Sequence, residues 1–465
     1  MIKALRILIT LVCLVSLGQQ ALAMDGPPPA DAPRDFSLPE KTLFQLDNGM
    51  GVTMVPFGDL PKISMVLRTR TGNLNEGQET WLADLAGALM QEGTTSLDAT
   101  ALRQKAAELG GAIGVGVGPE MTSVSISSLA EKGVQALELL TDVVRNPAFP
   151  DSELERIRAD FIRNLSISRV RPQGQAAVAM NARLYGDHPF SLVFPTEEQL
   201  RSYTIDDVRR YYRDNFGARR SHLFVSGHFD AETMRQAIEQ QFSDWQPGPD
   251  VFIDIPTPTR EGSLQVIDRP GAPQSTISIA IPVIGVADPD YSQLMMANDI
   301  LGGAGFLSRL FQNLREDKGY TYGPSASTGN NYRSAVWKFS ADVATEATGP
   351  SLSEFFKEIR RLQTTAPAED EMARIRGYRG GIFVLANASR GGIIGTLSFM
   401  DFHGLADSYL TQYTERLARV TPDQVSGIAS SQWPVEGMTI VVVGDRSVID
   451  QQLSEVAEIA PYLSD

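Results

Sequence analysis

The alternation of apolar and polar positions divides the chain into clusters of short strands followed by runs of helices. Apolar residues recur at every second position in "KISMVLRTRTG", "AIGVGVG" and "TSVSISSLA", which predicts β-strands. Asn48-Gly49 predicts a hairpin turn, because this pair favours positive φ. Helical spacing is found over 98–109, 134–145, 152–168 and 176–185, and an amphipathic helix is predicted from Thr80 to a stop at Gly93-Thr94. Clustered strands joined by hairpins favour an α+β fold with an antiparallel sheet over a doubly wound α/β fold.

The pattern occurs twice along the chain. "TIDDVRRYYRDNFGARRSHLFVSGHFD" begins at Thr204, and "TPDQVSGIASSQWPVEGMTIVVVGDRS" begins at Thr421. Each is read as a capped helix, a short loop and an apolar strand, and the strands end at Gly227 and Gly444, which keep the offset of the two threonines. The agreement in order and spacing predicts two homologous α+β domains, each an antiparallel sheet packed with helices.

Proline-rich stretches mark the expected boundaries. A lead-in at 24–37 follows the first residues, and "QPGPDVFIDIPTPTREG" at 246–262 divides the rest almost equally. The expected organisation is therefore an N-terminal domain at 38–245, a linker at 246–262 and a C-terminal domain at 263–465.

The first 23 residues are typical of a secretory signal peptide. Lys3 and Arg6 precede an apolar run at 7–17, which is too short to span a bilayer, and small residues up to Ala23 predict cleavage after that position. A tethered N-terminal anchor is the alternative. The only cysteine, Cys13, lies inside this segment, so the mature chain would hold no disulfide. We expect a periplasmic protein without membrane insertion after signal removal.

Composition excludes several functional classes. The net charge is −15 and no Lys/Arg-rich run stands out, so a nucleic-acid partner is not expected. No two histidines stand at the i, i+4 spacing that places two imidazoles on one helix face, and no serine lies in a Gly-x-Ser-x-Gly elbow. The four histidines, predicted to be structural rather than metal ligands, are His188, His222, His228 and His403.

The segment "WLADLAGALMQEGT" resembles the zinc-motif helix of the pitrilysin/insulinase-type peptidases, a family that includes mitochondrial processing peptidase. In that family two histidines of H-x-x-E-H bind zinc, the glutamate activates water, and a glutamate further along completes the ligands. The matching positions here are Asp84, Gly87, Ala88 and Asn164, so every ligand and the base are replaced. One carboxylate and one amide do not hold zinc tightly, and no metal or cofactor is expected in this chain.

The most specific motif is "LGGAGFLSRLFQNLREDKGYTYGPSAS" at 301–327, which is similar to a family stretch with an arginine and, seven residues later, a tyrosine. The family positions correspond to Arg315 and Tyr322, which the resemblance implies are substrate-binding groups. Arginine supplies charged donors and tyrosine a neutral donor, which suit a peptide carbonyl and developing negative charge. We expect a helix at 308–315 and the start of a strand at 320–325. The alternative is that Arg315 caps a helix and Tyr322 packs at an edge.

A chain with the substrate-orienting pair and without the zinc motif resembles the non-catalytic subunit of a two-chain peptidase. The resemblance implies half of a clamshell that pairs with a homologous zinc-bearing subunit and hydrolyses peptides with the partner's zinc. The alternative is a structural or peptide-binding pseudo-peptidase, like the family members retained in respiratory complexes. A standalone enzyme with unrelated chemistry has no residue constellation behind it.

Overall fold

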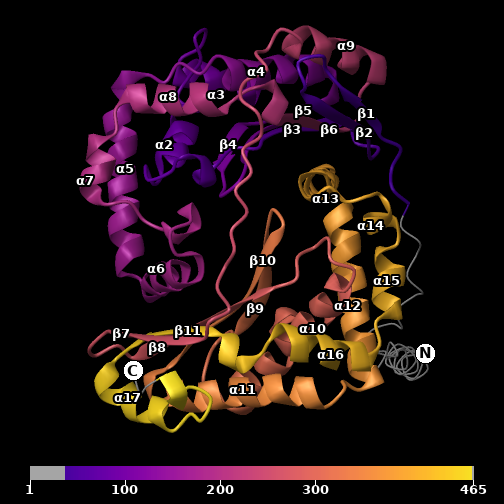
Figure 1. Cartoon of the computed structure of the whole chain (residues 1–465). Helices are drawn as coiled ribbons and strands as arrows, with labels where there is room; N and C mark the ends of the chain where they lie inside the picture. The colour runs from indigo at the N-terminus through magenta and orange to yellow at the C-terminus, as the bar shows by residue number, and fades with distance from the viewer. Residues whose placement is uncertain (1–36, 463–465) are drawn as a thin grey trace, which may run out of the picture. The chain divides into compact units, whose positions relative to one another are not determined.

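The computed structural model describes residues 37–462 (Figure 1). The predicted signal peptide at 1–23 and the lead-in, apart from its last residue, lie outside the described residues. Ser37 onward forms one compact unit by its internal contacts.

The N-terminal half contains a six-stranded sheet. Its strands all pair with antiparallel neighbours except β2 and β6, which run parallel. In spatial order they are β1 (Thr42–Gln45), β2 (Gly51–Pro56), β6 (Ser221–Gly227), β3 (Lys62–Thr69), β5 (Thr122–Leu129) and β4 (Ile113–Val117).

The C-terminal half repeats this order without the first strand. Here the parallel pair is β7 with β11, and the other neighbours are antiparallel. In spatial order the strands are β7 (Ser263–Asp268), β11 (Thr439–Gly444), β8 (Gln274–Val283), β10 (Ser334–Ala344) and β9 (Ser325–Asn331). The matching topology supports the predicted duplication.

The parallel pair in each sheet is a difference from the expected antiparallel sheets. In both halves the parallel strand, β6 or β11, arrives after a long helical segment, whereas hairpins join β1 to β2, β4 to β5 and β9 to β10. A helical crossover can return the chain in the same direction, which a tight turn cannot.

Helices cover one face of each sheet and bury its apolar side chains in two separate cores. The N-terminal helices are α2 (Leu82–Leu89), α3 (Ala99–Glu108), α4 (Gly133–Arg145), α5 (Asp151–Val170), α6 (Pro172–Tyr185), α7 (Glu197–Ser202), α8 (Ile205–Asn215) and α9 (Ala231–Phe242). The C-terminal helices are α10 (Tyr291–Asn298), α11 (Thr348–Thr364), α12 (Glu369–Asn387), α13 (Arg390–His403), α14 (Ser408–Thr411), α15 (Tyr413–Arg419), α16 (Pro422–Gln432) and α17 (Arg446–Ser454).

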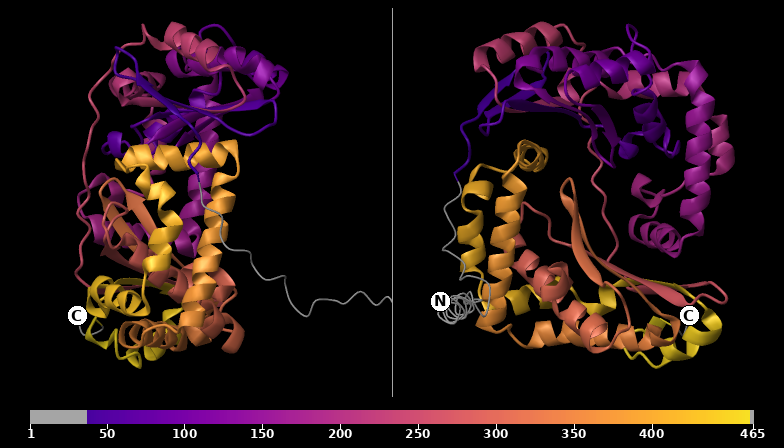
Figure 2. Two further views of the ribbon diagram at one scale, coloured as in Figure 1. Left: turned by 90° about the vertical axis from the view of Figure 1, so that its right-hand side faces the viewer. Right: turned by 180° about the vertical axis from the view of Figure 1, so that it is seen from behind.

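Each half lends one helix to the sheet of the other. Helix α6 packs on β8 and β11 of the C-terminal sheet, and α13 packs on β3 and β6 of the N-terminal sheet (Figures 1 and 2). Met180 of α6 is buried in a third apolar cluster with Val336, Val441 and Val443. The two halves are therefore held together by apolar burial as well as by the chain between them. That chain, residues 246–262, contains no helix or strand.

The predicted hairpin is present between β1 and β2. Gly49 adopts φ +94°, as the turn requires, while Asn48 is not among the residues with positive φ. The Asn48 amide instead donates to the carbonyl oxygens of Phe242 and Trp245 at 2.7 and 3.0 Å, and so fastens the turn to the end of α9.

Within residues 37–462, no single helix has the length and apolar character needed to cross a membrane. Helices α12 and α13 meet that test only as a pair, and they are bent by 105° relative to each other.

Candidate functional site

Helix α2 carries the positions that match the zinc motif, and it is shorter than the sequence predicts. It spans Leu82–Leu89, whereas the apolar pattern extends from Thr80 to Gly93. At its end, Gly93 and Thr94 form isolated bridges with Asp98 and Pro147 instead of helical turns. A tight local turn to Asp98 and a long-range bridge to Pro147 thus replace the last helical turns, and apolar periodicity does not reveal either one.

The start of α2 is capped by a carboxylate from outside the helix. Glu76 accepts hydrogen bonds from the backbone amides of Trp81 and Ala83 at 2.9 and 2.8 Å. These are donors that the first helical turn cannot satisfy internally. Trp81 itself has φ +67°, a left-handed conformation that is rare for a bulky side chain.

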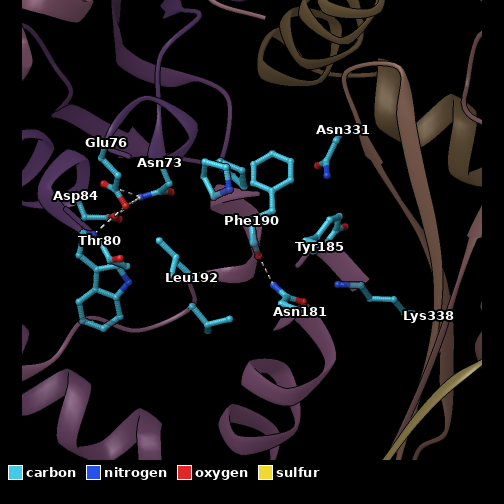
Figure 3. A pocket seen from close by; sticks show the side chains of 14 residues that line it. Asn73, Glu76, Thr80, Asp84, Asn181, Tyr185, Phe190, Leu192, Asn331 and Lys338 are labelled. Atoms are coloured by element: carbon cyan, nitrogen blue, oxygen red, sulfur yellow. Dashed lines mark hydrogen bonds between the residues drawn. The ribbon is translucent and has the colours of Figure 1, made fainter. Parts of the chain in front are cut away.

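Asp84, at the first motif position, belongs to this polar cluster. The Asn73 amide donates to its carboxylate at 2.6 Å and also lies 3.4 Å from both oxygens of Glu76 (Figure 3). Burial raises the pKa of Asp84 and raises the pKa of Glu76 to about 8. The two acids also repel each other electrostatically, so the site favours protonation of Glu76 near neutral pH.

We expect this cluster to make folding stability pH-dependent. Glu76 binds its proton more tightly folded than unfolded, so its contribution is fully present below about pH 4.5 and is lost as pH rises through about 8. The free energy of unfolding should fall across that window by up to about 1.4 kcal/mol per pH unit. Urea unfolding from pH 5 to 8 measures this slope. Glu76→Gln should make it shallower, and an identical slope in that variant would contradict the assignment.

Gly87 stands at the position of the catalytic glutamate, and valine side chains of a neighbouring strand lie against it. Gly87 is buried, and a Cβ placed on it would lie 2.5 Å from Cγ2 of Val117 and 3.5 Å from Cγ1 of Val115. Strand β4 therefore occupies the space into which a glutamate side chain would extend. Helix and strand approach each other this closely only because position 87 lacks a side chain.

The remaining two motif positions face a different hollow. Ala88 and Asn164 both line a pocket between α2, α3 and α5, together with Phe161 and Arg103. Asp84 lines a separate cavity. Among the described residues there is no group of three or more His, Cys, Asp or Glu side chains that could hold a metal ion.

Two of the histidines, His222 and His403, pack against neighbouring side chains. The ring of His222 contacts Thr53 Oγ1 at 2.8 Å and Asp401 at 3.2 Å, and it stacks on Phe224 with ring centroids 4.2 Å apart. His222 thereby joins the N-terminal sheet to helix α13. Burial and the nearby Arg70 guanidinium lower the pKa of His403 to about 4, so this imidazole is neutral at physiological pH.

The two predicted substrate-binding residues lie together. The Arg315 guanidinium carbon is 4.7 Å from the ring centroid of Tyr322 and 4.8 Å from that of Phe311. Tyr322 is 84% exposed, and its hydroxyl has no hydrogen-bond partner among residues 37–462. Arg315 has one carboxylate neighbour, Glu316 at 3.5 Å. Stacking thus orders the guanidinium and leaves the donors of both residues available.

The local backbone differs from the predicted α-helix and strand. Phe311–Asp317 forms a π-helix, η7, and β9 begins only at Ser325, so Tyr322 stands in the loop before it. Leu310 and Leu314 are buried. A wider helical turn is not distinguishable from an α-helix by apolar spacing over seven residues, and such π segments are frequent at functional sites.

The structure does not bring the Arg315–Tyr322 pair into one pocket with the positions that match the zinc motif. Neither Arg315 nor Tyr322 lines the cavity at Asp84 or the hollow at Ala88 and Asn164. The sequence alone also missed three side chains that shape the Asp84 cavity: Asn73, Glu76 and Lys338. Asn73 and Glu76 lie shortly before α2 in the sequence. An acidic residue just before a helix is the only local feature that could have indicated the cap at its N-terminus.

Comparisons with known proteins agree with the fold. Residues 61–189 match the family model described as Insulinase (Peptidase family M16), and residues 202–377 match the model described as Peptidase M16 inactive domain. The two matches together cover more than half of the chain.

Individual relatives are distant in sequence. An uncharacterized zinc protease of Rickettsia felis is 23% identical over 343 residues, which cover 71% of this chain and 80% of that protein. Cytochrome b-c1 complex subunit 1 of Bos taurus mitochondria is 25% identical over 274 residues, which cover 57% of this chain and 56% of that protein. The crystal structure of a peptidase M16 inactive domain from Pseudomonas fluorescens is 25% identical, with a TM-score of 0.81 over 87% of this chain and 98% of that chain.

Proposed function

The chain belongs to the pitrilysin/insulinase-like (M16) peptidases as a pseudo-peptidase without the zinc motif, and from this premise we propose that it is the non-catalytic subunit of a heterodimeric zinc metallopeptidase. It forms half of a clamshell, and a homologous partner with an intact motif supplies the zinc and the general base. The observation that carries the proposal is the ordered, solvent-facing pair of Arg315 and Tyr322 in a chain whose own motif positions are replaced.

The chemistry of the pair suits a peptide held at the partner's metal. An exposed guanidinium and an exposed phenol offer charged and neutral N–H and O–H donors to a carbonyl oxygen. The same donors stabilise the negative charge that develops when water attacks that carbonyl. Phe311 and Tyr322 flank the Arg315 guanidinium, and this stacking reduces the rotamer freedom that binding would otherwise have to remove.

The cellular setting is part of the same proposal. In residues 1–23 basic residues are followed by an apolar run and then by small residues. This order supports export to the periplasm with cleavage after Ala23. The net charge of −15 and the absence of a basic run support a peptide substrate rather than a nucleic acid.

We expect Tyr322→Phe to lower kcat of the two-chain peptidase about tenfold, because the hydroxyl donates to charge that is present only in the transition state. KM should change less than kcat. Steady-state kinetics on the reconstituted pair measure both constants. Tyr320→Phe, two residues away, is the matched control and should leave them unchanged. Equal kinetics in wild type and Tyr322→Phe would remove Tyr322 from the site.

A structural role without a catalytic partner is the second candidate. The similarity to cytochrome b-c1 complex subunit 1 favours it, since that relative is named as a component of a larger complex. In this case no zinc-bearing homologue accompanies the chain, and substitutions at Arg315 and Tyr322 change no activity. A neighbouring gene that encodes an intact H-x-x-E-H homologue favours the catalytic pair.

A further inference from the structure

A cavity of about 280 Å³ lies between the two halves, at the start of α2. One wall comes from the N-terminal half, and the other comes from strands β9 and β10 of the C-terminal sheet (Figure 3). This volume lies just below the usual range for ligand pockets, about 300–1,000 Å³, and suits one or two amino-acid residues rather than a long chain. Its apolar lining includes Trp81, Tyr185, Phe190 and Leu192.

Lys338 is the only basic residue among those that line this cavity. It alternates along β10 with the buried side chains of Trp337 and Phe339, which places it on the face of the sheet opposite the C-terminal core. No carboxylate pairs with its ammonium, and no hydrogen bond ties it to any of residues 37–462. The ammonium is open to the cavity but surrounded by protein, and this desolvation lowers its pKa.

An unpaired ammonium in such a place is costly unless an anion reaches it. Lys338 is exposed to solvent, which keeps this cost low. A carboxylate that enters gains a charge-assisted hydrogen bond in surroundings less polar than water, where that bond is stronger than on an open surface.

The opposite end of the cavity has the reverse polarity. Glu76 and Asp84 lie there, bridged by the Asn73 amide, and Figure 3 shows Lys338 on the far side of Phe190 and Tyr185 from these acids. A ligand carboxylate is attracted to the Lys338 ammonium, while at the other end the buried Asp84 disfavours a further negative charge and the protonated Glu76 adds no repulsion. An occupant with one carboxylate is fixed in a single direction.

Two further features suit a peptide. The Asn181 amide donates to the carbonyl oxygen of Phe190 at 3.1 Å, and its own oxygen remains available to accept from a ligand N–H. Asn331, on β9, also lines the cavity. Trp81 holds the left-handed conformation noted above, and backbone strain of this kind occurs at ligand sites when the surrounding structure maintains it.

We propose that this cavity binds a carboxylate-bearing residue of a peptide, with the carboxylate at the Lys338 ammonium and the adjoining residue between Trp81 and Phe190. The site needs neither zinc nor a partner subunit, so it goes beyond the proposed function and is testable on this chain alone. The carboxylate comes either from the C-terminus of a peptide or from an acidic side chain.

The test is a titration of the purified full-length chain by calorimetry and by tryptophan fluorescence, in which Trp81 reports the cavity. The probes are Ala-Ala with a free carboxylate, Ala-Ala amide, and acetyl-Ala-Glu-Ala amide. Binding of the first probe alone assigns a C-terminal carboxylate, and binding of the third alone assigns an acidic side chain. Ala-Ala amide, which lacks a carboxylate, should bind about tenfold more weakly than the carboxylate probe that binds, or not at all.

Lys338→Met keeps the length of the side chain and removes its charge, and it should weaken binding by about tenfold or more. Lys338→Arg should restore most of the affinity. Lys105→Met, at an exposed position on α3, is the matched control and should bind as wild type does. Thermal unfolding of each variant shows that the fold is kept. Absence of binding by both carboxylate probes, or equal affinity in wild type and folded Lys338→Met, would overturn the proposal.

Discussion

Replacement of Arg315 by alanine is expected to lower kcat/KM of the two-chain peptidase by about 10²-fold or more, while the two chains stay assembled. The size follows from the loss of a charged donor aimed at the oxygen on which negative charge develops, which is worth about 2.7–4 kcal/mol in comparable sites. Arg315 has no buried partner, since its neighbours are two aromatic rings and a partly exposed carboxylate. Its removal should therefore leave stability nearly unchanged. Peptide hydrolysis and size-exclusion chromatography of the reconstituted pair measure activity and assembly.

The matched control for this variant is Arg374→Ala. Arg374 lies exposed on α12 and pairs with Asp370 one turn earlier, as many surface arginines do. Full activity of Arg374→Ala together with the loss in Arg315→Ala identifies a site rather than a general effect of charge. Full activity in both variants contradicts the role of Arg315, and dissociation of the pair in Arg315→Ala assigns that residue to the subunit interface instead.

Gly87→Glu, which restores the catalytic position of the zinc motif, should destabilise the chain by about 2–4 kcal/mol. The new Cβ would lie 2.5 Å from Val117 Cγ2, and a carboxylate would enter a position that is buried between α2 and β4. Urea unfolding measures the loss. Gly377→Glu is the control, because position 377 is an exposed glycine within α12 with no atom near its Cβ site. That variant should be neutral or stabilising.

The same clash predicts the outcome of rebuilding the whole motif. With Asp84→His, Gly87→Glu, Ala88→His and Asn164→Glu combined, zinc affinity should stay far below that of a built site unless Val117 is also made smaller. Tight stoichiometric zinc in the fourfold variant with Val117 intact would show that β4 moves away at low cost. Helix α2 therefore lacks room for a glutamate side chain at position 87 as well as the zinc ligands.

Much of the fold was predictable from local patterns. Strict alternation located β3, β4 and β5, and the helical spacing located α3 to α6 within one to four residues. The topological repeat followed from the matched segments at Thr204 and Thr421, each of which begins a helix with a capping box. These features depend on neighbours in sequence, which is why the sequence reveals them.

The differences arise where distant segments determine the backbone. The bridge from Thr94 to Pro147 accompanies the early end of α2, and the parallel strand pairs depend on long crossovers. The exchange of α6 and α13 between the halves had no local signal either. Arg315 and Tyr322 were found because a long motif surrounds them. Lys338 was not found, because its proposed role depends on a cavity. The residues of the opposite wall lie more than 140 positions earlier in the chain.

Zinc content and peptide hydrolysis of the tagged chain, isolated gently from its native cells, test the helper-subunit function most directly. The expected result is about one zinc per pair of chains, with chelator-sensitive hydrolysis that disappears when this chain is purified alone. A lone chain that binds zinc and cleaves peptides would contradict the interpretation that the motif positions no longer hold zinc or a general base. These positions are Asp84, Gly87, Ala88 and Asn164. An inactive, metal-free chain without a homologous partner would contradict the heterodimer and leave the structural role.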